Sequence, residues 1–546
     1  MCRLFRHFGA VAMRPAFSLR LLYITKYNKE SDLLNKKQLG GIIVRKIKIS
    51  KKYLGLPVFA ERPEEILEIF TGRQKLYELK VSACEDTKIQ CDYYCFMNVE
   101  EYMGCEFTME GECGQGFYDG IIQSDSDQQP EIQRPLIHYT AERGWINDPN
   151  GLVYHDGTYH LYYQYNPANT KWENMSWGHA CSSDLLRFRS VETVLYPDEN
   201  GTVFSGCGLV NTRGKLGLPK DCLLFYYSAA GDTNKWGKGK LFTQRIAYST
   251  DGGMTLKRYP KEALGVLEKD SRDPKIFWHP ETDCYIMVLW IQGNEFAIFR
   301  SPDLENWEMT DRFTYDKAWE CPDLFRMECD GEEIWVFMSA DGFYYLGSFD
   351  GYHFQSDGIR HEAYLTDLPY AAQSYSGLED RIVVIPWLRT KNAGKLYTGM
   401  MGIPREVKLI KRGGEICLSL LPVREYHAQK AEIASIGSAN DRYITDIKDE
   451  AVTEIYLEKT GKEPVTVNFF GQELIIREDA LVLGEIQTKL PERFEDIHIL
   501  IDREVVEIYG NQGTLNAYYE TSRTELTGQI QIIGSDFSGK IFQWRP

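Results

Sequence analysis

Hydrophobic and polar residues alternate along most of this chain, in short runs separated by turn residues. Alternating runs occupy residues 76–81, 93–97 and 106–109, and runs rich in aromatic or β-branched residues occupy residues 159–165, 334–338 and 497–501. Alternation with a period of two predicts strands that are buried on one face. Asp-Gly pairs, which favour tight hairpin turns, begin at positions 156, 251, 330, 341 and 350. The pattern therefore predicts an all-β chain built largely from consecutive hairpins.

Breaks in this pattern divide the chain into parts. Residues 29–123 predict a small β-rich N-terminal module, with one short helix beginning at residues 61–65, where Pro63 stands among acidic residues. Residues 124–132 are polar, acidic and interrupted by Pro130, as in a linker. Residues 133–424 hold most of the hairpins, which suits a sandwich, a barrel or a propeller. Residues 425–546 predict a separate β-sandwich.

The first 28 residues do not continue the pattern, and we expect an unstructured or misassigned extension. Arg14 and Arg20 interrupt the apolar residues there, whereas a secretory signal needs a continuous apolar segment. The chain has 13 cysteines, an odd number, which favours free thiols in a reducing compartment. We therefore expect a cytoplasmic protein, with secretion as the alternative. The sequence contains no run of 18 or more apolar residues, so we expect no membrane-spanning segment.

Composition narrows the class of partner. A net charge of −17 argues against nucleic acid or an anionic membrane as a partner. Aromatic residues make up 13% of the chain, which suits β-structure and flat surfaces on which sugars stack. Neither a nucleotide-binding glycine motif nor zinc-ligand spacing occurs, so we expect no cofactor and no metal. The expected partner is a small-molecule or oligosaccharide substrate, and the oligomeric state stays open.

Three acidic residues of the central part stand in rigid settings. Asp148 and Asp273 each precede a proline, which disfavours the helical region for the preceding residue. Glu320 lies between Trp319 and Cys321, one residue before another proline. Each acid alone is commonly a turn or ion-pair residue, and the Asn-Gly pair at 150–151 itself predicts a turn after Asp148. All three together indicate a carbohydrate-active site.

Hydrolysis of a glycosidic bond needs two carboxyl groups in different environments, one ionised and one protonated. Glu320 is the better acid, because apolar neighbours such as Trp319 favour the protonated form. Asp148 is the better nucleophile, because Asn147, Asn150 and backbone amides can donate hydrogen bonds to its ionised form.

The third acid, Asp273, is expected to bind sugar hydroxyls, with the adjacent Arg272 keeping it ionised.

These segments resemble the signature blocks of the family-32 glycoside hydrolases, which include invertases, exo-inulinases and levanases. The resemblance covers about residues 133–546 and several blocks in the family's order. The blocks are residues 145–151, 163–167, 177–180, 204–206, 244–249, 272–274, 320–323, 370–373 and 501–510. It implies a five-bladed β-propeller followed by a β-sandwich, and a retaining mechanism without a metal.

The resemblance also implies residue roles. Asp148 would attack the anomeric C2 of a terminal β-fructofuranosyl unit, and Glu320 would protonate the leaving oxygen and then activate water. Asp273 would bind the 3- and 4-hydroxyls of fructose. The implied substrate-binding residues are Trp145, Asn147, Gln164, Trp172, Phe204, Ser205 and Arg272. Two departures, Glu173 where many members have Gly and Cys207 where Ser or Ala is usual, affect the expected leaving-group preference.

We therefore predict an exo-acting β-fructosidase that removes terminal fructose from sucrose, fructo-oligosaccharides or fructans through a covalent fructosyl-aspartate. One alternative is a fructosyltransferase with the same three acids, in which a sugar replaces water. A second alternative is a non-catalytic fructan-binding propeller.

Overall fold

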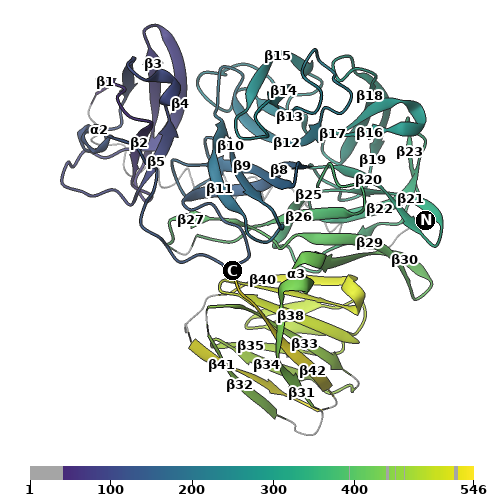
Figure 1. The fold of residues 1–546 in the computed structure, drawn as a ribbon. Coiled ribbons are helices and arrows are strands. Elements are labelled where there is room, and N and C mark those ends of the chain that lie inside the picture. The colour runs from purple at the N-terminus through teal and green to yellow at the C-terminus, as the bar shows by residue number, and fades with distance from the viewer. Residues whose placement is uncertain are drawn as a thin grey trace, which may run out of the picture.

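Strands account for nearly all the regular structure in the computed structural model (Figure 1). The structure describes residues 41–546 except 393, 438–441, 449, 460, 522–526 and 536. The expectation for residues 1–28 therefore lies outside the described residues. The all-β prediction is confirmed: a module of two small sheets lies beside a ring of five sheets, and a two-sheet sandwich packs below the ring.

The N-terminal module is built from short strands whose alternate residues are buried. Its four-stranded sheet has the order β1 (Ile43–Lys48), β6 (Glu106–Gly111), β3 (Glu64–Thr71) and β4 (Gln74–Ser82). Its three-stranded sheet has the order β5 (Tyr93–Asn98), β2 (Tyr53–Val58) and β7 (Ile122–Ser124). A 3-10 turn, η1 (Glu100–Tyr102), and the short helix α2 (Gln115–Gly120) complete the module.

The helix expected to begin at residues 61–65 is wrong, because this segment leads into strand β3. Leu67 and Ile69 alternate with polar residues and are fully buried. Their main chain pairs with β4 on one side and with β6 on the other. Sheet pairing on both sides outweighs the local preference of Pro63 and its acidic neighbours for a helix start.

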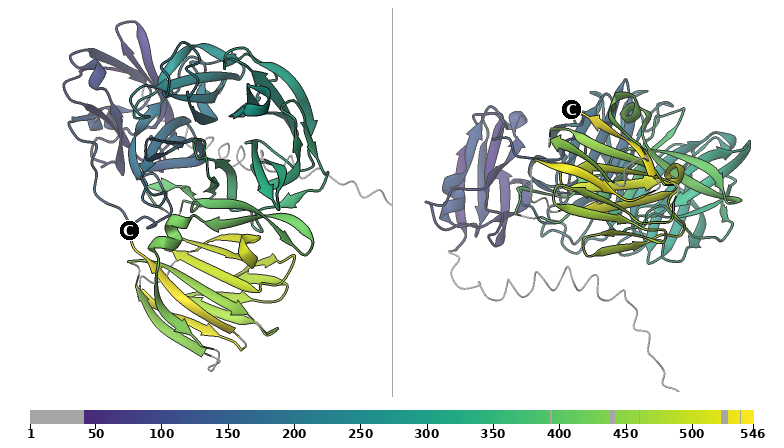
Figure 2. Two further views of the ribbon diagram at one scale, coloured as in Figure 1. Left: turned by 45° about the vertical axis from the view of Figure 1, so that its right-hand side comes forward. Right: turned by 90° about the horizontal axis from the view of Figure 1, so that it is seen from below.

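Five sheets of mostly antiparallel meanders form the ring, which the left view of Figure 2 shows clearly. This is the five-bladed propeller that the resemblance implies. Blade 1 holds β8 (Gly144–His155), β9 (Thr158–Asn166), β10 (Ser176–Ser182), β11 (Arg189–Leu195) and the parallel strand β27 (Tyr397–Thr398). Blade 2 holds β12 (Thr202–Val210), β13 (Leu223–Ala230), β14 (Thr243–Ser249) and β15 (Lys257–Leu264). Blade 3 holds β16 (Arg272–His279), β17 (Cys284–Gln292), β18 (Glu295–Ser301) and β19 (Glu308–Thr314), with the 3-10 turn η2 (Pro280–Thr282).

The last two blades complete the ring. Blade 4 holds β20 (Asp323–Cys329), β21 (Glu332–Met338), β22 (Phe343–Phe349), β23 (Phe354–Ser356) and β24 (His361–Glu362). Blade 5 holds β25 (Pro369–Ser374), β26 (Ile382–Leu388), β28 (Met400–Met401), β29 (Arg405–Arg412) and β30 (Glu415–Pro422). Within each blade the first strand runs away from one face of the ring and the second returns to it. The turn between second and third strands therefore lies on the face where the first strands begin.

The C-terminal sandwich follows the helix α3 (Arg424–Gln429) and consists of two six-stranded sheets. One sheet has the order β31 (Ala431–Ile436), β42 (Phe537–Trp544), β33 (Val452–Lys459), β38 (Asp496–Asp502), β39 (Val505–Gly510) and β40 (Leu515–Glu520), with the 3-10 turn η3 (Asn511–Gly513) before β40. The other has the order β32 (Arg442–Lys448), β41 (Thr527–Ile533), β34 (Val465–Phe469), β35 (Gln472–Ile476), β36 (Ala480–Leu483) and β37 (Ile486–Lys489). Apolar residues of both inner faces form one core.

A buried carboxylate fixes the sandwich to the propeller. Asp502, at the end of β38, accepts hydrogen bonds from the backbone N–H groups of Leu136, Ile137 and His138 at 2.8–3.2 Å. It also contacts Nδ1 of His138 at 2.8 Å, while Nε2 of that ring lies 3.0 Å from Glu507. All of the ionisable side chains in this cluster are fully buried. The segment that leads into the propeller is thereby tied to the sandwich.

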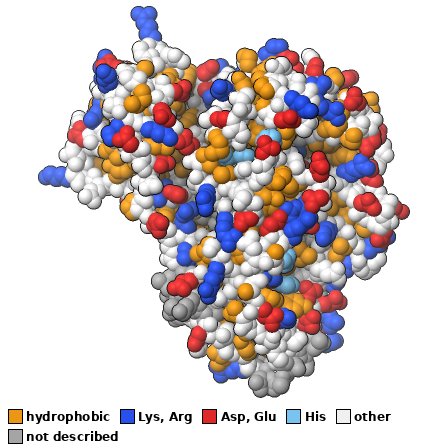
Figure 3. Space-filling view, in the orientation of Figure 1, with side chains coloured by type: hydrophobic (Ala, Val, Ile, Leu, Met, Phe, Trp, Pro, Cys, Tyr) orange, Lys and Arg blue, Asp and Glu red, His pale blue; other side chains and the backbone are white. Residues whose placement is uncertain are grey.

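The surface charges, the cysteines and the helices each add one observation. Acidic and basic side chains are interspersed over the face in Figure 3, without a continuous basic area. The twelve cysteines among the described residues are all free. No helix in the described part of the chain is long and apolar enough to cross a membrane.

Candidate active site

Four of the innermost strands are interrupted at the same level by a β-bulge, where two residues face one on the neighbouring strand. The register shifts between Ile146 and Pro149 in β8, and equivalent shifts occur in β12, β16 and β25. The bulged pairs are Asn147 with Asp148, Phe204 with Ser205, Asp273 with Pro274, and Ala371 with Ala372. A bulge redirects side chains that regular pleating would send into the blade. It thereby turns these residues toward the middle of the ring.

The backbone at this level is strained. Asp273, Glu320, Cys321 and Ala371 have φ values of 66°, 27°, 44° and 50°. This left-handed region costs non-glycine residues about 1–3 kcal/mol each and persists only where the surrounding structure enforces it. Such clusters occur at functional sites more often than elsewhere, so the strain marks this level of the ring as a candidate site.

The expected turn at residues 150–151 is wrong, because β8 continues through it. A second bulge lies between Asn150 and Val153, and Gly151 has a φ of +54° inside the strand. A Cβ atom at this position would lie 2.8 Å from the ring of Tyr162, so glycine is needed for both conformation and space.

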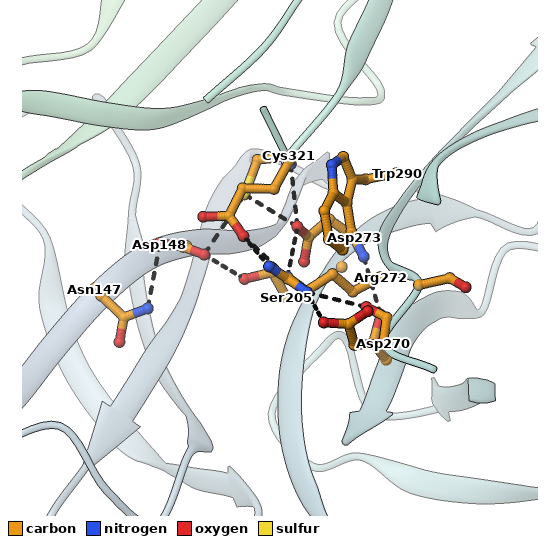
Figure 4. A network of polar contacts seen from close by, with 12 residues as sticks. Asn147, Asp148, Ser205, Asp270, Arg272, Asp273, Trp290 and Cys321 are labelled. Atoms are coloured by element: carbon orange, nitrogen blue, oxygen red, sulfur yellow. Dashed lines mark hydrogen bonds and ion pairs between the residues drawn. The ribbon is translucent and has the colours of Figure 1, made fainter. Parts of the chain in front are cut away.

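Asp148 points toward Ser205 and Cys321 (Figure 4). Its Oδ2 accepts a hydrogen bond of 2.6 Å from Ser205, and its Oδ1 accepts one of 3.2 Å from Asn147. Removal from bulk water, together with the negative charge of Glu320, raises the pKa of Asp148. Of the donors expected from the sequence, Asn147 contacts Asp148, whereas the side-chain amide nitrogen of Asn150 has no hydrogen-bond partner. The hydrogen bonds that Asp148 accepts compensate only part of the cost of burial.

Asp273 is the more deeply buried aspartate, with 6% of its surface exposed. Burial raises its pKa to about 7; Arg272 opposes this shift, whereas the charges of Glu320 and Asp148 add to it. Arg272 thus favours the ionised form of Asp273, as expected, but burial and the two other acids outweigh it. The guanidinium Nε lies 3.8 Å from Asp273, because its main contact is with the other acid.

Glu320 is the acid that Arg272 holds. Its Oε2 accepts hydrogen bonds from Nε and Nη2 of Arg272 at 2.9 and 2.6 Å, and its Oε1 accepts one of 2.5 Å from Tyr370. The apolar environment expected for Glu320 is therefore wrong. Trp319 packs instead against Trp290, with 5.0 Å between the ring centres. The guanidinium carbon of Arg272 lies over the Trp290 ring, 4.0 Å from its centre.

Cys321 connects the two aspartates. Its backbone N–H donates to Asp273 at 3.1 Å, and its Sγ lies 3.4 Å from Asp273 and 3.6 Å from Asp148. Burial and the neighbouring carboxylates raise the pKa of this thiol well above its ordinary value, so it remains a neutral donor. The sequence places Cys321 beside Glu320 but gives no signal of this bridging position. Tyr370 is missed for the same reason, since its partner lies 50 residues away.

The remaining residues expected in the pocket lie on the same strands and on one loop. Trp145 donates its Nε1–H to Asn147 at 2.9 Å and stacks edge-on against Trp387. Gln164 is 2% exposed on β9, and its Nε2 has no hydrogen-bond partner. Because β9 pairs with the bulged part of β8, Gln164 stands beside Asn147 and Asp148. An unpartnered buried amide there suits a ligand hydroxyl.

Two aromatic residues complete the set. Phe204 precedes Ser205 in the bulge of β12, and its ring lies 6.0 Å from that of Trp172 in an edge-on arrangement. Trp172 is 42% exposed on the loop between β9 and β10. The structure thus brings together all ten residues that the sequence nominated, on blades 1 to 3 and the segment before β20.

A small cavity lies beside Asp273. A cavity of about 10 Å³ is lined by Pro149, Ser205, Gly206, Asp273, Pro274, Cys321, Pro322, Ala371, Ala372 and Gln373. This is room for about one water molecule. Among the described residues, no group of three or more His, Cys, Asp or Glu side chains could hold a metal ion.

Comparison with known proteins gives this arrangement a family. Residues 138–419, more than half of the chain, match the model of the glycosyl hydrolases family 32 N-terminal domain. A levanase from Bacillus subtilis is 34% identical over 336 residues, which are 55% of this chain and 48% of the levanase. An extracellular exo-inulinase from Meyerozyma guilliermondii is 31% identical over 381 residues, which are 62% of this chain and 71% of the inulinase. The chain thus spans about half the length of the levanase.

A solved structure extends the likeness to the N-terminal module. The family-32 glycoside hydrolase from Bifidobacterium adolescentis covers 93% of this chain, and 99% of that chain is covered, with a TM-score of 0.64 and 18% identity. A share of 93% must include most of the residues before β8, so that fold has a comparable module. The match of the family model, over the same strands that carry the three acids, shows that this chain belongs to glycoside hydrolase family 32.

Proposed function

We propose that this protein is a retaining exo-β-fructosidase that hydrolyses terminal β-D-fructofuranosyl units of sucrose, fructo-oligosaccharides or fructans. The observation that carries the proposal is the convergence of Asp148, Asp273 and Glu320 at one level of the propeller, with Cys321 contacting both aspartates and Arg272 bound to Glu320. A non-catalytic binding propeller would not need three mutually repelling carboxyl groups, two of which have raised pKa values.

In this proposal Asp148 attacks C2 of the fructosyl unit, and the bond from C2 to the leaving oxygen breaks as Glu320 gives that oxygen its proton. Glu320 then takes a proton from water, the water oxygen bonds to C2, and the Asp148 carboxylate is released. Three carboxyl groups beside one guanidinium leave an excess of negative charge. That excess favours retention of a proton in the site near neutral pH, which the acid step requires.

Asp273 is proposed to bind fructose hydroxyls, as are Asn147 and the unpartnered amide of Gln164. The names of the levanase and the exo-inulinase to which the chain is similar support a fructan or a related fructoside as substrate.

The test is a product profile of the purified protein on sucrose, inulin and levan. We expect free fructose from at least one of them, and a loss of at least about 10³-fold in kcat with Asp148→Asn. Turnover by that variant at the wild-type rate would refute the assignment of the nucleophile. NMR of the first-formed fructose should show the β-anomer, because two successive displacements at C2 retain its configuration. Retaining enzymes place the two carboxyl groups about 5–5.5 Å apart.

The same experiment separates hydrolysis from transfer. At high sucrose, a hydrolase releases fructose in proportion to glucose, whereas a fructosyltransferase releases glucose and builds longer oligosaccharides. The location of the protein is a further proposal: free thiols favour a reducing compartment, while the exo-inulinase relative is named as extracellular. Fractionation of the source cells would decide between them.

A further inference from the structure

The hairpin of β3 and β4 in the N-terminal module contacts two loops of the propeller at the rim of the site. One loop, residues 167–175, joins β9 to β10, and the other, residues 231–242, joins β13 to β14. Both join the second and third strands of a blade. They therefore lie on the face where the inner strands begin and where Asp148 and Asp273 are placed.

The first loop is bound by the edge of the module. β4 is the outer strand of its sheet, and the free main chain at Lys80 pairs with the side chain of Asn174: the N–H donates to Oδ1 at 2.7 Å and the carbonyl accepts from Nδ2 at 2.8 Å. The Lys80 ammonium contacts Glu173 at 2.5 Å. Asn169 in turn donates to Glu64 of β3 at 2.7 Å. Backbone, charge and amide contacts thus hold this loop at three points.

The second loop is held by two acids of the same hairpin. Glu78 is 4% exposed and accepts the backbone N–H of Trp236 at 2.9 Å. Glu68 accepts from the Lys235 ammonium at 2.8 Å, and Lys75 lies 5.2 Å from the centre of the Trp236 ring. The seam between the module and both loops leaves a cavity of only about 20 Å³, so the contact is closely packed.

These loops carry the two aromatic residues that flank Phe204. The ring centre of Trp172, from the first loop, lies 6.0 Å from that of Phe204. The ring centre of Phe242, from the second loop, lies 5.4 Å from that of Phe204, and both pairs are edge-on. Phe204 immediately precedes Ser205, which donates to Asp148 at 2.6 Å. The module therefore holds the residues that border the outer side of the pocket, although it does not itself reach the acids.

We propose that the N-terminal module is a specificity element, in which Lys80 acts as a positioning residue that holds Trp172 over the pocket through Glu173 and Asn174. The inference rests on the proposed β-fructosidase function. Trp172 is 42% exposed, and a large apolar side chain on a loop stays in one orientation only if the loop is held. Sugar units beyond the terminal fructose must pass this rim, so its position affects longer substrates more than sucrose.

The contact with Lys80 explains why a glutamate stands at position 173. It stands where many family members have glycine, and it is the partner of a lysine that belongs to the module. A glycine there could not make this contact, so the departure in the propeller and the presence of the module are linked.

The test compares Lys80→Met, which keeps the length of the side chain and removes its charge, with Lys46→Met. Lys46 forms an exposed ion pair with Glu106 inside the module, 2.7 Å long, and does not contact the propeller in the structure. We expect Lys80→Met to raise KM for oligosaccharides of three to five units about threefold or more, while kcat on sucrose stays within about twofold. Lys46→Met should match the wild type.

Two further variants keep the test specific. Glu173→Gln should reproduce the effect of Lys80→Met, and the exchanged pair, Lys80→Glu with Glu173→Lys, should restore KM toward the wild type. Limited trypsin digestion gives a readout without turnover: cleavage after Lys171, which is exposed on the same loop, should be faster in Lys80→Met than in Lys46→Met.

The inference is overturned if Lys80→Met resembles the wild type in both assays, or if Lys46→Met shows the same changes. Faster cleavage after Lys171 with an unchanged KM for oligosaccharides would also overturn it, because the loop would then be held without any effect on specificity. Failure of the proposed function is distinct, because the wild-type protein would then turn over no β-fructoside while the trypsin readout still reports on the loop.

Discussion

Replacement of Asp273 by Asn should abolish fructoside hydrolysis and at the same time stabilise the folded protein. The carboxyl group is buried beside Asp148 and Glu320, and its pKa rises from about 3.8 to about 7. The folded protein therefore binds the Asp273 proton more tightly than the unfolded chain does. As a result, the contribution of Asp273 to the free energy of unfolding is greatest below pH 3.8 and falls as the pH rises toward 7.

The size of the effect follows from that shift. At about 1.4 kcal/mol per pKa unit, a rise of about three units corresponds to an upper bound of about 4 kcal/mol in the free energy of unfolding. Adjustment of the site in the variant reduces this figure, so we expect Asp273→Asn to gain about 2–4 kcal/mol near pH 8. Asparagine keeps the shape of the side chain, so packing contributes little to the difference.

The assay is urea unfolding of wild type and variant at pH 5 and pH 8, with the sandwich and propeller transitions followed separately. Asp303→Asn is the control of opposite sign. Burial raises the pKa of Asp303, but hydrogen bonds from Asn306 outweigh it and lower the pKa to about 2. That variant should lose stability above pH 3.8. A gain for Asp273→Asn that is equal at both pH values, or a loss at pH 8, would refute the reasoning.

Three further outcomes are expected. Glu320→Gln should slow hydrolysis most for poor leaving groups, and equal losses on sucrose and an activated aryl fructoside would argue against an acid role. Arg272→Met removes the cation that lowers the pKa of Asp273, so the acid limb of the kcat/KM profile should move to higher pH. Asp502→Asn should cost about 3–5 kcal/mol in unfolding experiments, because it breaks a buried ion pair with His138. Burial lowers the pKa of His138, but Asp502 and Glu507 raise it to about 9, so the wild-type contribution is full below pH 6.5 and lost as the pH rises through about 9.

Local pattern was sufficient where a residue's environment is set by its neighbours in the chain. The alternation at residues 93–97 predicts the strand β5 (Tyr93–Asn98), and the Asp-Gly pair at 156–157 marks the turn between β8 and β9. It was insufficient at residues 61–65, where pairing with β4 and β6 decided for a strand. It was also insufficient at Gly151, where the predicted turn is a bulge inside β8.

The sequence by itself determined the strand-rich architecture and nominated Asp148, Asp273 and Glu320, because period-two alternation and Asp-Pro or Trp-Glu neighbours are local. Only the tertiary structure decided what each acid touches. Arg272 is adjacent to Asp273 in the sequence, yet its guanidinium binds Glu320, 48 residues away. Tyr370 donates a hydrogen bond to the same carboxyl group from another blade. Partners that come from different blades are set by ring closure and by the bulges of the inner strands. Those depend on packing between segments far apart in the chain, which no local pattern encodes.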